Sequence, residues 1–148
     1  IIENEAELAA VLSHEVAHVN CRHVFNMIMP NRKKSVDSIV SGLIGAKNVS
    51  FSVAFNQLVS KGIQILFQKG LQHKDEREAD IAAVYYLQNT GYDQKAYSHL
   101  LSRFKKESES YSNTHPPMQS RLDTVNSFLN TNNKGKVLLK RFVQNVEN

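Results

Sequence analysis

The chain has 148 residues, of which 41% are hydrophobic and 22% charged, and its net charge is +4. These values are typical of a globular protein with one sizeable core, so we expect a single domain over residues 1–148. The one cysteine, Cys21, excludes an internal disulfide. The clearest basic cluster lacks interleaved aromatic residues, so we expect no nucleic-acid partner. That cluster comprises Lys134, Lys136, Lys140 and Arg141.

Little glycine, little proline and no tryptophan favour a helix-rich fold. The first predicted helix runs from about Glu3 to Met29 and is ended by Pro30. Large apolar residues recur along it at spacings of three and four, which predicts a buried stripe. The stripe consists of Leu8, Leu12, Val16 and Val19.

This first helix carries the motif HEVAH at residues 14–18. Residues four apart share a helix face, about 5–6 Å apart at Cβ, so His14 and His18 can bind the same metal ion. Glu15 lies about 100° further round the helix, where its carboxylate can reach a water on that metal without being a ligand. HExxH on a helix is typical of zinc metalloproteases, although the same pattern also fits an ordinary amphipathic helix with histidines on its polar side.

His23 is the next histidine along the chain. A metzincin site, HExxHxxGxxH, would require glycine at position 21 and histidine at position 24, where this chain has Cys21 and Val24. On a continuous helix His23 lies on the far side, so we interpret it as a surface or core residue. The third ligand must then come from elsewhere.

Residues 31–50 form a polar connection, and 51–71 are predicted to be a core helix. An alternative is that this helix lies on a membrane or covers the active site, because it is too polar to span a bilayer. A further helix is predicted over 73–91, where Glu76 and Asp80 are four residues apart. A glutamate there can complete a His₂Glu site, and an aspartate one turn later can orient a ligating imidazole. Asp75 and Glu78 are other candidates, and a solvated helix start is the alternative.

Asp93 is expected to cap a scaffold helix of about 94–111. In the segment THPPMQSRL, 114–122, the prolines suit the first turn of another helix, with His115 on the loop before it. This helix is predicted to continue to about Leu129. The last segment, from Val137, is expected to be a short helix or an edge strand.

HEVAH followed by EREAD at 76–80 resembles the gluzincin zinc metalloproteases, the family of HtpX, the CAAX prenyl protease, BepA and the Oma-type peptidases. The resemblance implies one Zn²⁺ per chain, bound by His14, His18 and Glu76. It also implies that Glu15 is the catalytic base and that Asp80 is a partner of His14. THPPMQSRL resembles the HP…R segment of the family. By that resemblance His115 lies near the metal, as a fourth ligand or as a donor to the transition state, and Arg121 forms a structural ion pair.

The resemblance implies a mainly α, helical gluzincin-like core that hydrolyses polypeptides, with a location in the cell envelope (periplasm or membrane-associated) and a role in protein quality control. The chain has no initiator methionine and no signal sequence. We therefore expect it to be an N-terminally truncated domain that lacks the strands preceding HExxH in the family, is itself inactive, and self-associates. The alternative function is a catalytically silent helical interaction module with a structural or latent zinc site.

Overall fold

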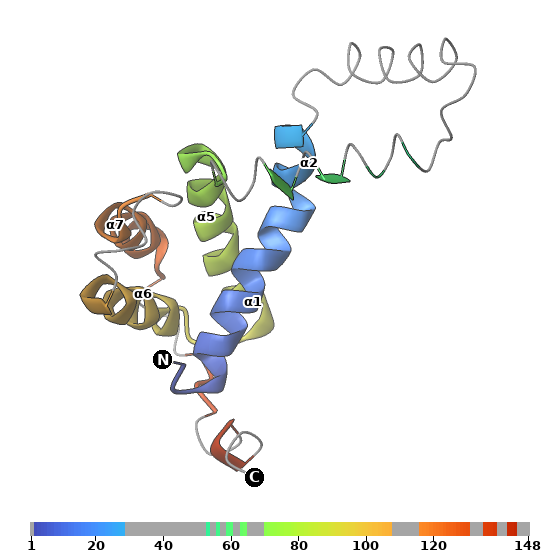
Figure 1. The fold of residues 1–148 in the computed structure, drawn as a ribbon. Helices are drawn as coiled ribbons and strands as arrows, with labels where there is room; N and C mark the ends of the chain where they lie inside the picture. Colours follow the sequence, from blue (N-terminus) through green and yellow to red (C-terminus); the bar gives the residue numbers. More distant parts are fainter. Residues whose placement is uncertain are drawn as a thin grey trace.

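The computed structural model describes residues 2–28, 53, 56, 59–60, 63–64, 70–107, 116–130, 135–138 and 142–144. Its main elements within these ranges are helices, which confirms the mainly α prediction (Figure 1). They are α1 (Glu5–Asn20), α2 (His23–Ile28), α5 (His73–Thr90), α6 (Lys95–Glu107) and α7 (Met118–Phe128). The predicted connection at 31–50 and most of the predicted helix at 51–71 lie outside the described residues. In the part of the chain that is described, no helix has the length and apolar character that crossing a bilayer requires.

The prediction of one continuous helix over 3–29 was wrong, because α1 ends at Asn20 and α2 begins at His23. The amide of Cys21 still donates to Ala17 O at 2.9 Å, and that of Arg22 donates to Val19 O at 3.0 Å. Arg22 then adopts a φ of +57°, in the left-handed region. A non-glycine residue adopts that conformation at a cost of about 1–2 kcal/mol. The helix therefore breaks at a residue type that does not indicate a break in the sequence.

Helices α1 and α5 lie side by side and form the most extensive helix contact among the described elements (Figure 1). Five alanines on these two helices are completely buried: Ala6, Ala10 and Ala17 on α1, and Ala79 and Ala83 on α5. The distance between packed helices depends on the side chains at their contact, so methyl groups allow the two backbones to approach closely. The histidine face of α1 is thereby brought against the first turns of α5.

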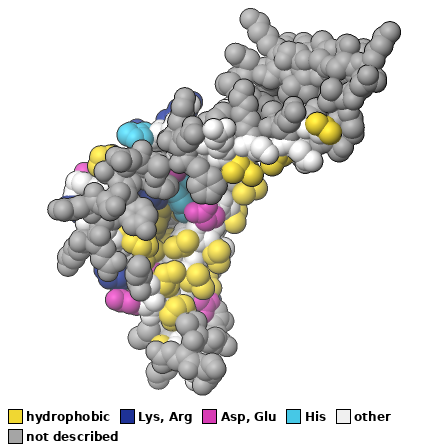
Figure 2. All heavy atoms as spheres, viewed as in Figure 1, with side chains coloured by type: hydrophobic (Ala, Val, Ile, Leu, Met, Phe, Trp, Pro, Cys, Tyr) yellow, Lys and Arg dark blue, Asp and Glu magenta, His cyan; other side chains and the backbone are white. Residues whose placement is uncertain are grey.

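The predicted buried stripe on α1 was also wrong. Its four side chains are exposed, from 36% for Leu8 to 74% for Val19. Figure 2 shows hydrophobic side chains gathered along this side of the molecule. Helix α1 has two apolar faces, and the one that packs on α5 combines alanines with His14 and His18. The leucines and valines therefore face outward.

Helix α7 packs against α5, and α6 packs against α7 and α1 to complete the core. The helix predicted over 73–91 ends at Thr90, and Gly91 caps it with a φ of +78° that favours glycine. The predicted cap at Asp93 is confirmed, because the amide of Lys95 donates to the Asp93 carboxylate at 3.0 Å. Further along, Lys136 forms an isolated parallel bridge with Tyr92. The central cluster comprises Ala10, Ala83, Val84, Leu87, Tyr97, Leu101 and Val125.

The two faces of α1 should respond differently to substitution. Ala10→Leu places a larger side chain in the closed contact with α5 and should lower the free energy of unfolding by about 1–3 kcal/mol. Leu12→Ser, at a position that is 56% exposed, should change it by no more than about 0.5 kcal/mol. Urea unfolding at low protein concentration measures both values. A larger loss for Leu12→Ser than for Ala10→Leu would contradict this orientation of α1.

Candidate metal centre

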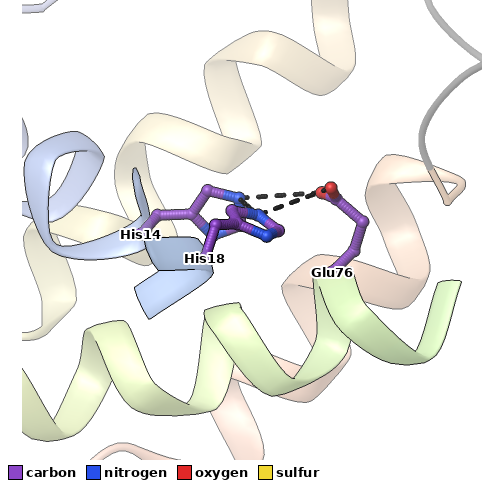
Figure 3. A group of neighbouring side chains, drawn as sticks. All are labelled: His14, His18 and Glu76. Atoms are coloured by element: carbon purple, nitrogen blue, oxygen red, sulfur yellow. Dashed lines mark hydrogen bonds and ion pairs between the residues drawn. The ribbon is translucent and has the colours of Figure 1, made fainter. Parts of the chain in front are cut away.

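Three buried side chains from α1 and α5 converge on one point (Figure 3). His14 and His18 are one turn apart on the buried face of α1, and their Nε2 atoms are 3.0 Å apart. Glu76, in the first turn of α5, places Oε2 3.6 Å from His14 Nε2. Its other oxygen, Oε1, is 3.5 Å from His18 Nε2. The structure thus brings together the three residues that the sequence predicted as ligands.

These separations fit a small divalent cation. Zn–N and Zn–O bonds of about 2.0–2.1 Å in a tetrahedral arrangement place neighbouring ligand atoms about 3.3 Å apart. The three measured distances, 3.0, 3.5 and 3.6 Å, lie on both sides of that value. Two imidazoles and one carboxylate are also the donor set of open catalytic zinc sites. The residues present therefore fit a zinc ion.

The far side of the His14 ring is held by Asp80 and Tyr97. His14 Nδ1 is 3.1 Å from Asp80 Oδ1 and 3.1 Å from the Tyr97 hydroxyl. The Tyr97 hydroxyl itself donates to Asp80 Oδ1 at 2.6 Å. A hydrogen on Nδ1 directed at the carboxylate leaves the Nε2 lone pair facing His18 and Glu76.

Arg121, from α7, donates hydrogen bonds to both Asp80 and Tyr97. Its Nη2 donates to Asp80 Oδ1 at 2.7 Å and to the Tyr97 hydroxyl at 3.0 Å. Its Nε donates to Asp80 Oδ2 at 3.0 Å. Both residues are buried, so the guanidinium and the carboxylate form the structural ion pair expected for Arg121. This pairing joins α5 to α7 beside the candidate centre.

The pKa values reflect this arrangement. Burial would raise the pKa of Asp80, but hydrogen bonds from His14 and Arg121 outweigh it and lower the pKa. Burial would lower the pKa of His14, but Asp80 and Glu76 outweigh it and raise the pKa. Burial, followed by the charge of His14, lowers the pKa of His18 to about 4. The raised pKa of His14 shows that Asp80 and Glu76 together favour a positive charge at this position, in addition to that of Arg121.

Two predicted functional residues are less fully described. Glu15 is exposed on α1, directly after His14. His115 lies outside the described residues, and the description resumes at Pro116, just before α7. The other two acidic candidates for the third ligand point elsewhere or are less buried. Glu78 has a 63% exposed side chain that faces His23, and Asp75 is half-buried.

Sequence reasoning missed two residues of the site, Tyr97 and His23. Tyr97 lies on the apolar face of α6, where a buried hydroxyl needs a hydrogen-bond partner, and that need was the available signal. His23 was expected on the far side of a continuous helix. Because α1 ends at the break near Arg22, His23 is instead buried, with 2% of its surface exposed. Its Nδ1 lies 2.8 Å from Nδ1 of His18.

A second group of candidate ligand atoms adjoins the first. It comprises Cys21, His23 and Glu78, whose ligand atoms lie within 4.8 Å of one another. Burial, together with a hydrogen bond to Glu78 and its negative charge, raises the pKa of the Cys21 thiol. The thiolate form that binds metals is therefore disfavoured at this position.

Several known proteins that are similar to this chain are β-barrel assembly-enhancing proteases. The β-barrel assembly-enhancing protease of Yersinia pestis is 28% identical over 144 residues, covering 86% of this chain and 28% of that protein. The protein of the same name from Escherichia coli strain K12 is 27% identical over 130 residues, covering 81% of this chain and 26% of that protein. The chain thus spans about a quarter of the length of these relatives. No solved structure matches the chain significantly.

The model of peptidase family M48 matches residues 1–128. That match includes both helices that converge at the candidate metal centre, as well as α6 and α7. The chain belongs to peptidase family M48, a family of metalloproteases.

Proposed function

We propose that the chain is a zinc-dependent endopeptidase that hydrolyses peptide bonds with metal-activated water. The observation that carries the proposal is the convergence of two imidazoles and one carboxylate, all buried, at separations suited to one zinc ion. Membership of family M48 supports the same reaction class. One zinc per chain is expected, with His14, His18 and Glu76 as its ligands.

His14, His18 and Glu76 would hold the zinc, which would lower the pKa of a bound water and polarise the scissile carbonyl. Glu15 takes one proton of the attacking water and passes it to the leaving amine, and the hydroxide that remains becomes part of the new carboxyl group. Asp80 holds the His14 ring so that Nε2 faces the metal, and Tyr97 and Arg121 hold Asp80. His115 is proposed as a donor to the oxyanion or as a fourth ligand.

Polypeptide substrates follow from the protease relatives. Two of them are named for enhancing β-barrel assembly, and on that basis we propose quality control of unfolded polypeptides in the cell envelope. The exposed apolar face of α1, made by Leu8, Leu12, Val16 and Val19, supports the further prediction of self-association.

Zinc content tests the ligand assignment. The purified chain should bind one zinc per molecule, and His14→Ala and Glu76→Ala should each lose it, because a two-ligand remnant holds zinc weakly. His99→Ala, which removes an exposed histidine on α6, is the matched control and should keep full zinc. Elemental analysis of protein prepared without chelators gives the numbers. Full zinc in both site variants would show that the ion is held elsewhere.

Peptide hydrolysis tests the role of Glu15. Glu15→Gln should retain the zinc of the wild-type chain and, in a longer form of the protein that hydrolyses an unfolded protein such as casein, lower turnover by about 10²–10⁴-fold, because it removes the base with little change in size. Asp123→Asn, at an exposed position on α7, makes the same chemical change away from the site and should have no effect. Unchanged turnover in zinc-loaded Glu15→Gln would exclude Glu15 as the base. A longer form that binds zinc without hydrolysing casein would instead favour the silent interaction module.

Sedimentation velocity tests self-association through α1. The wild-type chain should associate as its concentration rises, and Val19→Glu should weaken this, because a charge at a 74% exposed position would become buried in the contact. Asn89→Glu adds the same charge at an exposed position on α5 and is the control. Equal association of the three proteins would contradict a contact through this face.

A further inference from the structure

His23 occupies a position between His18 and an acidic side chain. It is the first residue of α2 and is 2% exposed. Its Nδ1 lies 2.8 Å from Nδ1 of His18, with the two rings nearly perpendicular and their centroids 4.9 Å apart. Its Nε2 lies 3.5 Å from Oε2 of Glu78. None of these contacts takes part in the proposed reaction.

We propose that His23 is a positioning residue for His18: it accepts the Nδ1 hydrogen of His18 and so keeps the His18 Nε2 lone pair directed at the metal. This inference rests on the proposed function. A neutral imidazole carries one N–H, and the other nitrogen binds the metal. His18 Nε2 faces His14 and Glu76, so the hydrogen must be on Nδ1. At 2.8 Å the facing atom must then be an acceptor, which is the unprotonated Nδ1 of His23.

This assignment also places the hydrogen of His23. With Nδ1 as an acceptor, the neutral ring carries its hydrogen on Nε2, which points toward the Glu78 carboxylate. The contact is long, and the Glu78 side chain is 63% exposed. Glu78 therefore orients the His23 ring less strongly than His23 orients the His18 ring. The two ligating imidazoles thus have different supports: His14 donates directly to Asp80, and His18 donates to a second imidazole.

The same hydrogen assignment decides against a second metal at Cys21, His23 and Glu78. A metal on His23 Nε2 would require the hydrogen on Nδ1 of a neutral ring. That hydrogen would oppose the Nδ1 hydrogen of His18 across 2.8 Å, and two donors would face each other. Occupancy of the first site by His18 Nε2 and occupancy of the second by His23 Nε2 are therefore mutually exclusive while this contact is kept.

The break at Arg22 makes the contact possible. On a continuous helix, a residue five positions after His18 lies about 140° away around the axis and faces another direction. The left-handed residue at 22 ends α1 and starts α2 in a new direction, so the His23 ring returns to His18.

Zinc affinity tests the proposal. His23→Leu keeps the bulk and removes the acceptor, so it should weaken zinc binding about 10–100-fold in competition with a chromophoric chelator. His23→Asn, whose Oδ1 can take the place of Nδ1, should restore affinity to within a few-fold of wild type. His99→Leu is the exposed control and should have no effect. Wild-type affinity in His23→Leu, or equal losses in His23→Leu and His23→Asn, would overturn the proposal.

Imidazole NMR on the wild-type chain gives a readout that does not depend on the variants folding. In the zinc-loaded protein, ¹⁵N–¹H correlations should show hydrogen on Nδ1 of His18 and on Nε2 of His23. A hydrogen on His23 Nδ1, or a metal-bound His23 Nε2, would contradict the assignment. Cys21→Ser should leave one zinc per chain, whereas two zincs in wild type, one of them lost in Cys21→Ser, would establish the second site instead.

Failure of the two proposals can be told apart. If the wild-type chain binds no zinc, or keeps it in His14→Ala, the proposed function fails and the inference fails with it. If one zinc is bound and lost in His14→Ala, but His23→Leu binds it as tightly as wild type, the inference alone fails.

Discussion

The close contact between α1 and α5 is the constraint on which the rest of the site depends. Alanines at the contact allow the two backbones to approach, and this approach brings the Nε2 atoms of His14 and His18 within 3.5–3.6 Å of the Glu76 carboxylate. A larger residue at Ala10 or Ala83 would separate the helices and move the carboxylate away from the imidazoles. The small side chains therefore determine the geometry of the centre without touching a ligand atom.

Helix α5 contributes more than one ligand. Within two turns it presents Glu76 to the candidate metal, Asp80 to His14 and Glu78 to His23. The buried Asp80 is stabilised in its charged form, because His14, Tyr97 and Arg121 all face it. These partners come from α1, α6 and α7, so the helices that complete the core also complete the polar network around one imidazole.

The two ligand pairs could be predicted because residues four apart share a helix face whatever the tertiary structure. The orientation of α1 could not be predicted. Its alanine face and its Leu/Val face are both apolar, and the spacing of apolar residues does not show which of the two faces is buried. The break at Arg22 had no local signal, because a left-handed arginine is stabilised only by its surroundings. His23 was misplaced for that reason. The single-domain organisation, the ligand roles of His14, His18 and Glu76, and the roles of Glu15 and His115 stay predictions.

The partners of His14 are far from it in the chain, at Glu76, Asp80, Tyr97 and Arg121. During synthesis, α1 leaves the ribosome before any of these four partners of His14 has been made. Contacts of such long sequence separation form late in folding, after the entropy of closing the loop between them has been overcome. The proposed metal centre therefore forms only after α5 has packed against α1. A chain that ends before α7 also lacks Arg121, so Asp80 loses its cationic partner and restrains the His14 ring less firmly.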